Sequence, residues 1–199
     1  SAPGNMYNWG EVAIYENIGG SWSQIGQDIN GNQGSGNGRT ISLSTDGNTI
    51  AIGAPGSDGN GNNAGHVRIY ENISGSWTQI GQDIDGEAAN EYSGYSVSLS
   101  SDGDIVAIGA PYSDGNGYHS GHVRIFENIS GSWSQIGQDI DGLTNDVSGR
   151  SVSISSDGNI VVIGAPYSDA SGSYSGCVRI FENISGTWVQ LGQDIDGNA

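Results

Sequence analysis

Apolar and polar residues alternate along most of the chain in short runs with the two-residue period of β-strands. In "YSVSLS" (95–100) apolar residues alternate with serines, as expected of a strand with one buried face. The next run, "DIVAIGAP" (104–111), is apolar at nearly every position, which is typical of a strand covered on both faces. Two further runs, "GHVRIFENI" (121–129) and "GSWSQIGQDI" (131–140), complete a set of four predicted strands, and no segment shows a helical period of useful length.

This set of four strands is repeated along the chain. An Asp-Gly turn signal joins the first two strands of each set, and "ENISG" or "ENIGG" joins the last two. The repeats are marked by tryptophans at steps of 55, 56 and 55 residues: Trp22, Trp77, Trp133 and Trp188. Four-stranded antiparallel units in tandem predict an all-β fold, a β-propeller whose blades are the repeats.

We expect one repeat domain of three and a half blades. Residues 1–30 form a half blade with only the third and fourth strands, and complete blades cover 31–85, 86–141 and 142–199. Three interpretations of the odd half blade stand: a piece of a longer repeat protein, association between copies of the chain, or a cap on the neighbouring blade. We expect self-association or further blades from a longer chain, because an unpaired blade edge invites association.

The alternating strand direction places the two kinds of connection on opposite faces. The short turns lie together on one face, and the long connections, such as 82–95 and 111–122, lie on the other. Because loops carry most binding functions, we expect a ligand to bind the long-loop face.

Three segments carry a family resemblance: "NGRTISLSTDGNTIAIGAP" (37–55), "SGYSVSLSSDGDIVAIGAP" (93–111) and "SGRSVSISSDGNIVVIGAP" (148–166). They resemble FG-GAP repeats, the blades of the integrin α-subunit propeller, and each keeps an intact Gly-Ala-Pro. The Phe of the Phe-Gly element is absent from all three. The family's calcium loop is shortened here to a tight turn with one aspartate, so that calcium site is not carried over. The resemblance implies adhesion or recognition of a protein or glycan, in a secreted or cell-surface protein.

The charge is strongly unbalanced, with 22 acidic residues, five arginines, no lysine and a net charge of −17. Such a surface repels nucleic acid phosphates and anionic membranes, which excludes both as partners. The longest apolar run is far shorter than a membrane span, so we expect no membrane insertion. The sequence does not start with a secretory signal, and we expect the mature form if the protein is exported.

Acidic residues are concentrated in the loops that follow the fourth strands. Alternating acids among glycines suit Ca²⁺, which takes six to eight oxygen ligands. The alternative is that these side chains bond to nearby backbone amides and stabilise turns. The candidate metal ligands are Asp83, Asp85, Glu87, Asp139, Asp141, Asp194 and Asp196.

Tyrosines stand beside Asn and Asp in the long loops. Exposed aromatic rings with such neighbours are the usual parts of sugar-binding sites, and they are equally usual in protein contacts. The candidate ligand-binding residues are Tyr112, Asp114, Asn116, Tyr118, Tyr167, Asp169 and Tyr174.

No catalytic centre is predicted. The paired acids recur in every blade, whereas a catalytic pair is normally unique, so we expect that the protein is not an enzyme. Cys177 stands where the other blades have His66 and His122; the thiol is expected to be incidental, and the histidines are expected to pack at strand ends. Arginines recur within the third strands, and we expect them to make a repeated contact between blades: Arg68, Arg124 and Arg179.

The turn between the third and fourth strands carries "NIS", which fits both N-glycosylation and simple turn formation, at Asn72, Asn128 and Asn183. Taken together, these features predict a non-catalytic extracellular FG-GAP-like propeller for adhesion or recognition. One alternative is a structural, self-assembling extracellular repeat subunit, and a second is a calcium-assisted propeller lectin.

Overall fold

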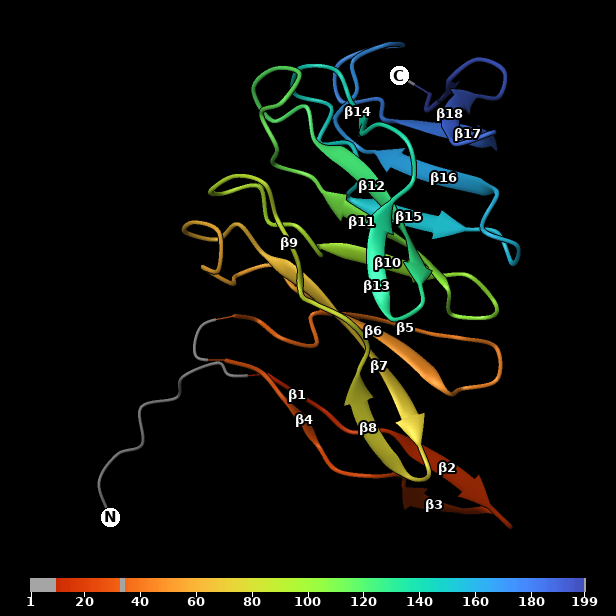
Figure 1. The fold of residues 1–199 in the computed structure, drawn as a ribbon. Coiled ribbons are helices and arrows are strands. Elements are labelled where there is room, and N and C mark those ends of the chain that lie inside the picture. Colours follow the sequence, from red (N-terminus) through yellow and green to blue (C-terminus); the bar gives the residue numbers. More distant parts are fainter. Residues whose placement is uncertain (1–9, 33–34, 199) are drawn as a thin grey trace.

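The computed structural model describes residues 10–32 and 35–198 (Figure 1). These residues form β-strands joined by turns, and they include no helix that is long and apolar enough to cross a membrane. The predicted all-β class is confirmed.

Three antiparallel sheets have the same internal order. The first sheet contains β5 (Thr40–Leu43), β6 (Thr49–Ala54), β7 (His66–Ile73), β8 (Ser76–Gln79) and β9 (Ile84–Asp85). The second contains β10 (Ser96–Leu99), β11 (Ile105–Ala110), β12 (His122–Ile129), β13 (Ser132–Gln135) and β14 (Ile140–Asp141). The third contains β15 (Ser151–Ile154), β16 (Ile160–Ala165), β17 (Cys177–Ile184), β18 (Thr187–Gln190) and β19 (Ile195–Asp196).

The N-terminal part forms a hairpin that corresponds to the third and fourth strands of a sheet. In this N-terminal hairpin β1 (Glu11–Val12) pairs with β4 (Ile29–Asn30), and β2 (Tyr15–Ile18) pairs with β3 (Ser21–Gln24). The start of the predicted half blade, residues 1–9, lies outside the described residues. The blade count and the blade boundaries stay predictions.

One prediction about the strands is wrong: the run 131–140 is not a single strand. It is divided into β13 and β14, which pair with opposite ends of β12. Gly137 lies between them with a φ of 70°. Because a left-handed residue interrupts the extended backbone, the chain leaves the ladder after β13 and rejoins it at β14.

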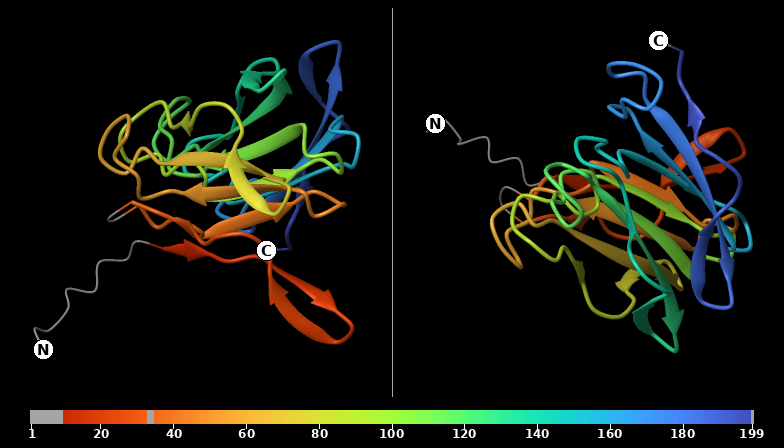
Figure 2. Two further views of the ribbon diagram at one scale, coloured as in Figure 1. Left: turned by 60° about the horizontal axis from the view of Figure 1, so that its bottom comes forward. Right: turned by 90° about the horizontal axis from the view of Figure 1, so that it is seen from above.

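The sheets follow one another in chain order, from the N-terminal hairpin at one end to β17 and β18 at the other (Figure 1), and the left view of Figure 2 shows the same order by colour. Each core cluster lies between two successive sheets. One, for example, joins Val67 and Ile69 of the first sheet to Val106 and Ile108 of the second. Burial of this apolar surface is the main force that holds neighbouring sheets together.

The innermost strands are also joined directly through serine side chains. The Ser42 hydroxyl accepts a hydrogen bond from the Leu99 amide at 2.9 Å. In the next pair of sheets, the Ser98 hydroxyl accepts one from the Ile154 amide at 3.1 Å. The serines that alternate with apolar residues in the sequence therefore bond to the neighbouring sheet.

The repeated tryptophans connect the fourth strand of each sheet to the chain just after the fourth strand of the preceding repeat. The indole Nε1 of Trp133, for example, donates to the Ile80 carbonyl at 3.0 Å, and its side chain is almost fully buried. Trp77 and Trp188 make the equivalent bonds at 2.9 Å. Trp22, in the N-terminal hairpin, is 72% exposed.

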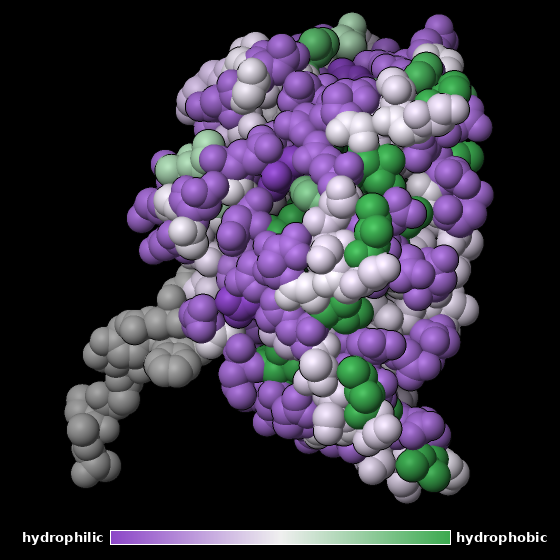
Figure 3. Space-filling view, in the orientation of Figure 1, coloured by the Kyte–Doolittle hydropathy of each residue, from purple (hydrophilic) through white to green (hydrophobic). Residues whose placement is uncertain are grey.

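Hydrophilic residues cover most of the face shown in Figure 3, and apolar residues occur there in small separate groups. Among the exposed apolar side chains are three isoleucines at the ends of third strands: Ile73, Ile129 and Ile184. The face in Figure 3 offers no broad apolar surface, in keeping with the high net charge.

Candidate functional site

Three side chains from equivalent repeat positions come together where the innermost strands begin. Arg39, Tyr95 and Arg150 directly precede β5, β10 and β15. The guanidinium carbon of Arg39 lies 4.5 Å from the centre of the Tyr95 ring, and that of Arg150 lies 4.9 Å from it. Both arginines therefore make cation–π contacts with one tyrosine.

A cavity of about 640 Å³ opens beside this arginine–tyrosine group. We call it the inner-rim pocket; it is lined by Gly36, Arg39, Pro55, Gly56, Asn90, Tyr92, Tyr95, Tyr112 and His119. A second cavity of about 470 Å³ shares Arg39 and Tyr95 with it and is also lined by Arg150. None of the described lining residues of the inner-rim pocket is acidic, although the chain carries a net charge of −17.

Aromatic contacts fix the wall of the pocket. Tyr112 lies edge-on to Tyr92, Tyr95 and His119, with ring centres 5.5, 6.1 and 5.3 Å apart. The imidazole of His119 also stacks on Tyr118 at 3.9 Å. Edge-to-face and stacked rings restrict one another's orientation, so the wall is rigid before any ligand binds.

Two wall residues have a left-handed backbone that side-chain-bearing residues rarely adopt. The φ angle is 57° at Tyr92 and 46° at His119. The Asp114 carboxylate accepts a hydrogen bond from the His119 amide at 2.7 Å, which holds this conformation. The equivalent residues of other repeats, Asn63, Val147 and Tyr174, have the same left-handed backbone, so it belongs to the repeated loop. In the middle blade this loop places two rings at one cavity.

The arginines also bond to the phenol oxygens of the wall. Arg39 Nη2 donates to the Tyr95 hydroxyl oxygen at 2.9 Å, and Arg150 Nη1 donates to that of Tyr112 at 3.0 Å. Each phenol oxygen acts as an acceptor in this bond, so its own O–H remains available to donate to a ligand. The pocket thus combines positive charge, hydroxyl donors and aromatic surface.

Only one of the predicted ligand-binding residues, Tyr112, lines the inner-rim pocket. Asp114 holds the His119 loop, and the Asn116 side chain donates to the Gly142 carbonyl at 2.9 Å. Tyr118 stacks on His119 with its own side chain exposed.

The remaining predicted ligand-binding residues belong to the last blade. Tyr167 and Tyr174 pack edge-on at 5.7 Å, and Asp169 accepts a hydrogen bond from the Tyr174 amide at 2.7 Å. Asp169 thus holds the loop of the last blade as Asp114 holds the loop of the middle one. A binding role for these residues stays a prediction.

Sequence reasoning missed Arg39, Tyr95, Arg150 and His119 as site residues. A signal was present, because three of the five arginines are fixed within the third strands and the other two, Arg39 and Arg150, share one repeat position. Two positive charges at equivalent positions of a strongly acidic chain indicate a shared role.

Among the residues that the structure describes, three groups of side chains could hold a metal ion, each built around the first residue of a third strand. Within each group the candidate ligand atoms lie within 4.8 Å of one another. The groups are His66, Asp83 and Asp85; Glu87, His122 and Asp139; and Cys177, Asp194 and Asp196. Of the predicted metal ligands, Asp141 alone lies outside these groups; burial, and then the nearby Asp139 carboxylate, raise the pKa of Asp141.

In the first and third groups an arginine of the third strand is paired with the aspartate. Arg68 Nη2 lies 2.7 Å from Asp83, and Arg179 Nε lies 2.8 Å from Asp194. The hydrogen bonds from Arg68 hold the pKa of Asp83 below its usual value. The charge of each of these aspartates is therefore already balanced within the protein.

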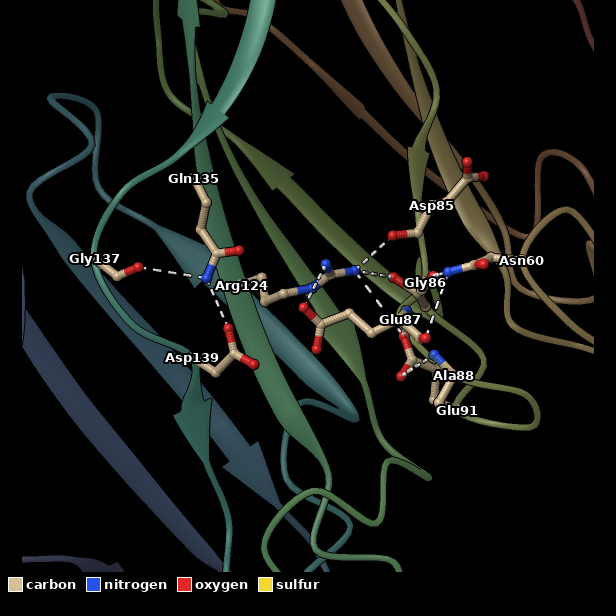
Figure 4. Close-up of polar contacts among 11 residues, drawn as sticks. Asn60, Asp85, Gly86, Glu87, Ala88, Glu91, Arg124, Gln135, Gly137 and Asp139 are labelled. Carbon is tan, nitrogen blue, oxygen red and sulfur yellow. Dashed lines mark hydrogen bonds and ion pairs between the residues drawn. The ribbon is translucent and has the colours of Figure 1, made fainter.

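The second group is different, because Arg124 turns away from Asp139 (Figure 4). Its Nη2 donates to the Asp85 carbonyl at 2.8 Å, and its Nη1 lies 3.4 Å from Glu87. Asp139 accepts a hydrogen bond from the Gln135 side chain instead, at 2.7 Å.

The predicted arginine contact between blades holds for two of the three arginines. Arg124 and Arg179 reach the loop that precedes their own sheet, where Arg179 Nη1 lies 2.7 Å from Asp146. Arg68 bonds instead to Asp83, within its own sheet.

The remaining Asp and Asn residues singled out in the sequence stabilise turns. In the first Asp-Gly turn, the Ser44 hydroxyl lies 2.6 Å from Asp46, and its hydrogen bond, followed by those from Asn48, lowers the pKa of Asp46 to about 2. The "NIS" asparagines each accept a hydrogen bond from a glycine amide three residues later, at 2.8 Å: Asn72, Asn128 and Asn183. Their glycosylation stays a prediction.

The family model for FG-GAP repeats matches residues 84–126 and 138–181. The chain therefore contains FG-GAP repeats, as its sequence predicted. No curated protein sequence matches the chain.

Several solved structures have a similar fold. A proposed 6-phosphogluconolactonase of Bacteroides fragilis aligns with a TM-score of 0.60 and 19% identity over 86% of this chain and 42% of its own. A proposed 6-phosphogluconolactonase of Bacteroides uniformis aligns with a TM-score of 0.64 and 16% identity over 94% of this chain and 48% of its own. Hydrazine synthase of Kuenenia stuttgartiensis aligns with a TM-score of 0.50 and 12% identity over 80% of this chain and 36% of its own. The chain thus spans less than half the length of these proteins.

These comparisons correct two predictions. We expected a non-catalytic adhesion or recognition module, with a structural subunit or a lectin as alternatives, and we expected no enzyme activity. The three structures described above are instead named as enzymes, two of them as proposed 6-phosphogluconolactonases, which contradicts both expectations. At these low identities the likeness itself establishes the fold alone.

Proposed function

We propose that this FG-GAP repeat chain binds an anionic sugar lactone in the inner-rim pocket and hydrolyses it. The observation that carries the proposal is the pair Arg39 and Arg150, which both contact Tyr95 in a chain with only five positive charges. Arg39 lines the pocket, and Arg150 bonds to Tyr112 of its wall. The names of the similar propellers suggest the substrate class.

The arginines would bind the anionic group of the substrate. A guanidinium presents planar N–H donors that match a phosphate or carboxylate, and such charge-assisted hydrogen bonds are about twice as strong as neutral ones. Because the pocket's described lining residues include no carboxylate, the anion would meet no like charge there. The tyrosine rings would pack on the apolar face of the sugar.

The hydroxyl groups and the histidine supply groups suited to hydrolysis. The O–H of Tyr95 or Tyr112, whose oxygen already accepts a hydrogen bond from an arginine, would donate to the lactone carbonyl oxygen as negative charge develops on it. His119 would accept a proton from water while the water oxygen bonds to the carbonyl carbon. The ring C–O bond then breaks, and the leaving oxygen takes the proton back from His119, which yields the open hydroxy acid.

The rest of the ring belongs to the same proposal. The similar structures are about twice as long as this chain. We infer that further blades, or a second copy of the chain, complete the wall around the inner-rim pocket. A secreted or cell-surface location also stays a proposal.

Calcium is not assigned a role in this activity. Each of the three candidate metal groups includes an imidazole or a thiol, whereas Ca²⁺ takes six to eight oxygen ligands. The donor sets therefore favour other divalent ions over the calcium expected from the sequence.

The test is lactone hydrolysis, followed by acid release, with glucono-1,5-lactone and its 6-phosphate as paired substrates. We expect hydrolysis above the spontaneous rate for the phosphate. Arg39→Gln and Arg150→Gln should each raise KM for the phosphorylated substrate about 10- to 100-fold, the effect of losing one charged hydrogen bond. They should leave KM for the neutral lactone nearly unchanged.

His119→Gln should lower kcat with little change in KM, because it removes the proton acceptor and leaves the arginines in place. Tyr15→Phe, in the N-terminal hairpin and 51% exposed, is the control and should change neither constant. If both lactones are hydrolysed no faster with the protein than spontaneously, the proposed enzyme activity is refuted. Equal effects of Arg150→Gln on both substrates would refute the anion-binding role.

A further inference from the structure

We propose that Glu87, His122 and Asp139 bind one divalent transition-metal ion. The candidate ligand atoms of these residues lie within 4.8 Å of one another, although they come from three separate segments. Glu87 lies in the loop before β10, His122 begins β12, and Asp139 directly precedes β14. The site does not depend on the inner-rim pocket and has its own test.

His122 is the ligand that points to a metal. Its side chain is 2% exposed, and its Nε2 atom has no hydrogen-bond partner in the part of the chain that the structure describes. Leaving a buried polar atom unpaired costs about 1–3 kcal/mol, so such atoms normally have a partner. A metal bound at Nε2 would supply it.

The second group is better suited than the other two because its aspartate is free of arginine. Asp83 and Asp194 are each paired with the arginine of their own sheet at 2.7–2.8 Å. Asp139 has only the neutral Gln135 as a side-chain partner among the described contacts. At Asp139 a cation therefore displaces no ion pair, and at Glu87 it competes with Arg124 only across 3.4 Å, whereas in the other groups it would compete with a guanidinium at 2.7–2.8 Å.

The ligand types identify the class of ion. One imidazole nitrogen with two carboxylates suits Zn²⁺, Co²⁺, Fe²⁺ or Ni²⁺ better than Ca²⁺ or Mg²⁺, which prefer oxygen ligands. The two carboxylates carry two negative charges against one positive charge on Arg124, 3.4 Å from Glu87. The net charge of −17 further favours cation binding.

Only a small adjustment is needed to form the coordination sphere. Ligand atoms around tetrahedral zinc lie about 3.3 Å apart, given metal–ligand distances of about 2.0–2.1 Å. Glu87 is the flexible member, because its side chain is 50% exposed and its contact with Arg124 is loose. Rotation of Glu87 would close the group around an ion held by His122 and Asp139, with water completing the coordination.

The experiment is titration of the chain with Co²⁺, followed by visible absorption, and with Zn²⁺, followed by calorimetry. We expect one equivalent of metal per chain and the absorption bands of tetrahedral or five-coordinate Co²⁺. Glu87→Gln should weaken binding at least about tenfold. Because Glu87 is exposed, this variant tests the site without disturbing the core. His122→Gln, checked for folding by circular dichroism, should abolish the bands.

Asp85→Asn is the matched control, since Asp85 is an exposed carboxylate of the first group. It should change the affinity for Co²⁺ by less than about twofold, which corresponds to about 0.4 kcal/mol. The proposal is overturned if no Co²⁺ band develops at millimolar metal. It is also overturned if Glu87→Gln has no effect, or if Asp85→Asn weakens binding as much as Glu87→Gln does.

Discussion

The buried tryptophans should supply much of the cohesion between sheets, and Trp133 is the one to test. A tryptophan buries about 200 Å² of surface, which at about 25 cal/mol per Å² amounts to about 5 kcal/mol. This value is an upper bound, because the unfolded chain already buries part of that surface. Trp133 lies in the cluster between the first and second sheets, and its side chain is almost fully buried. We therefore expect Trp133→Ala to lower the free energy of unfolding by about 3–5 kcal/mol.

Trp133→Phe separates packing from hydrogen bonding. It keeps most of the apolar contact but leaves the Ile80 carbonyl without its indole donor at 3.0 Å. The expected loss is about 1–3 kcal/mol, that is, the cost of an unpaired carbonyl together with a small cavity. If Trp133→Phe lowered the free energy of unfolding as much as Trp133→Ala, the hydrogen bond, and not the buried ring, would be the main contribution of Trp133 to stability.

The assay is urea unfolding followed by circular dichroism, with Trp22→Ala as the control. Trp22 has the same sequence context but is 72% exposed. Trp22→Ala should therefore lower the free energy of unfolding by no more than about 0.5 kcal/mol. Equal destabilisation by Trp22→Ala and Trp133→Ala would refute the argument that burial against the preceding sheet is what matters. The same argument would be refuted if Trp133→Ala lowered the free energy of unfolding by less than about 1 kcal/mol.

Two further predictions concern repeated positions that occur in different surroundings. Ser44→Ala should raise the pKa of Asp46 from about 2 toward its ordinary value in a carboxyl NMR titration, while Asp157 in the equivalent turn stays at about 2. Because the folded-state pKa is lowered, this turn's contribution to stability is present above about pH 4 and is lost as pH falls toward 2; in the variant that contribution should be largely absent. Gly137→Ala should destabilise the chain by at least about 2 kcal/mol more than Gly192→Ala, measured by thermal unfolding. Both glycines have φ near 70°, but an added Cβ meets the Gly186 carbonyl only at Gly137, so equal losses would contradict a steric contact between sheets.

Most of the fold could be predicted from the sequence, because each strand and turn has a characteristic local sequence pattern. The Asp-Gly turns, the alternating serines and the repeated tryptophans all correspond to contacts of the structure, such as the bond from the Leu99 amide to Ser42. The fourth strand was predicted as continuous because its apolar residues continue through Gly137. A left-handed glycine breaks a strand without changing that pattern, which is why the interruption was missed.

The candidate site was much less predictable. Arg39, Tyr95 and Arg150 are separated by more than fifty residues at each step, and only the arrangement of the sheets brings them together. The acids and amides attracted attention because they are abundant in loops. Several of them, such as Asp114 and Asn116, instead hold the loops through backbone hydrogen bonds. Composition cannot distinguish a carboxylate that stabilises its own loop from one that is free to bind a ligand.

Comparison between the repeats helps to distinguish structural side chains from those that bind a ligand. The sheets have the same strand order, so a difference between equivalent positions needs its own explanation. Residues kept in every repeat, such as the fourth-strand tryptophans, make contacts between sheets. Both proposed sites lie where the repeats differ. Tyr95 stands between two arginines at equivalent positions, and Glu87 stands where the next repeat has Leu143. A purely structural repeat has no need for these differences, since the strands beside them pair in the same way. The substitutions that distinguish the middle blade are therefore the ones on which binding and catalysis should depend.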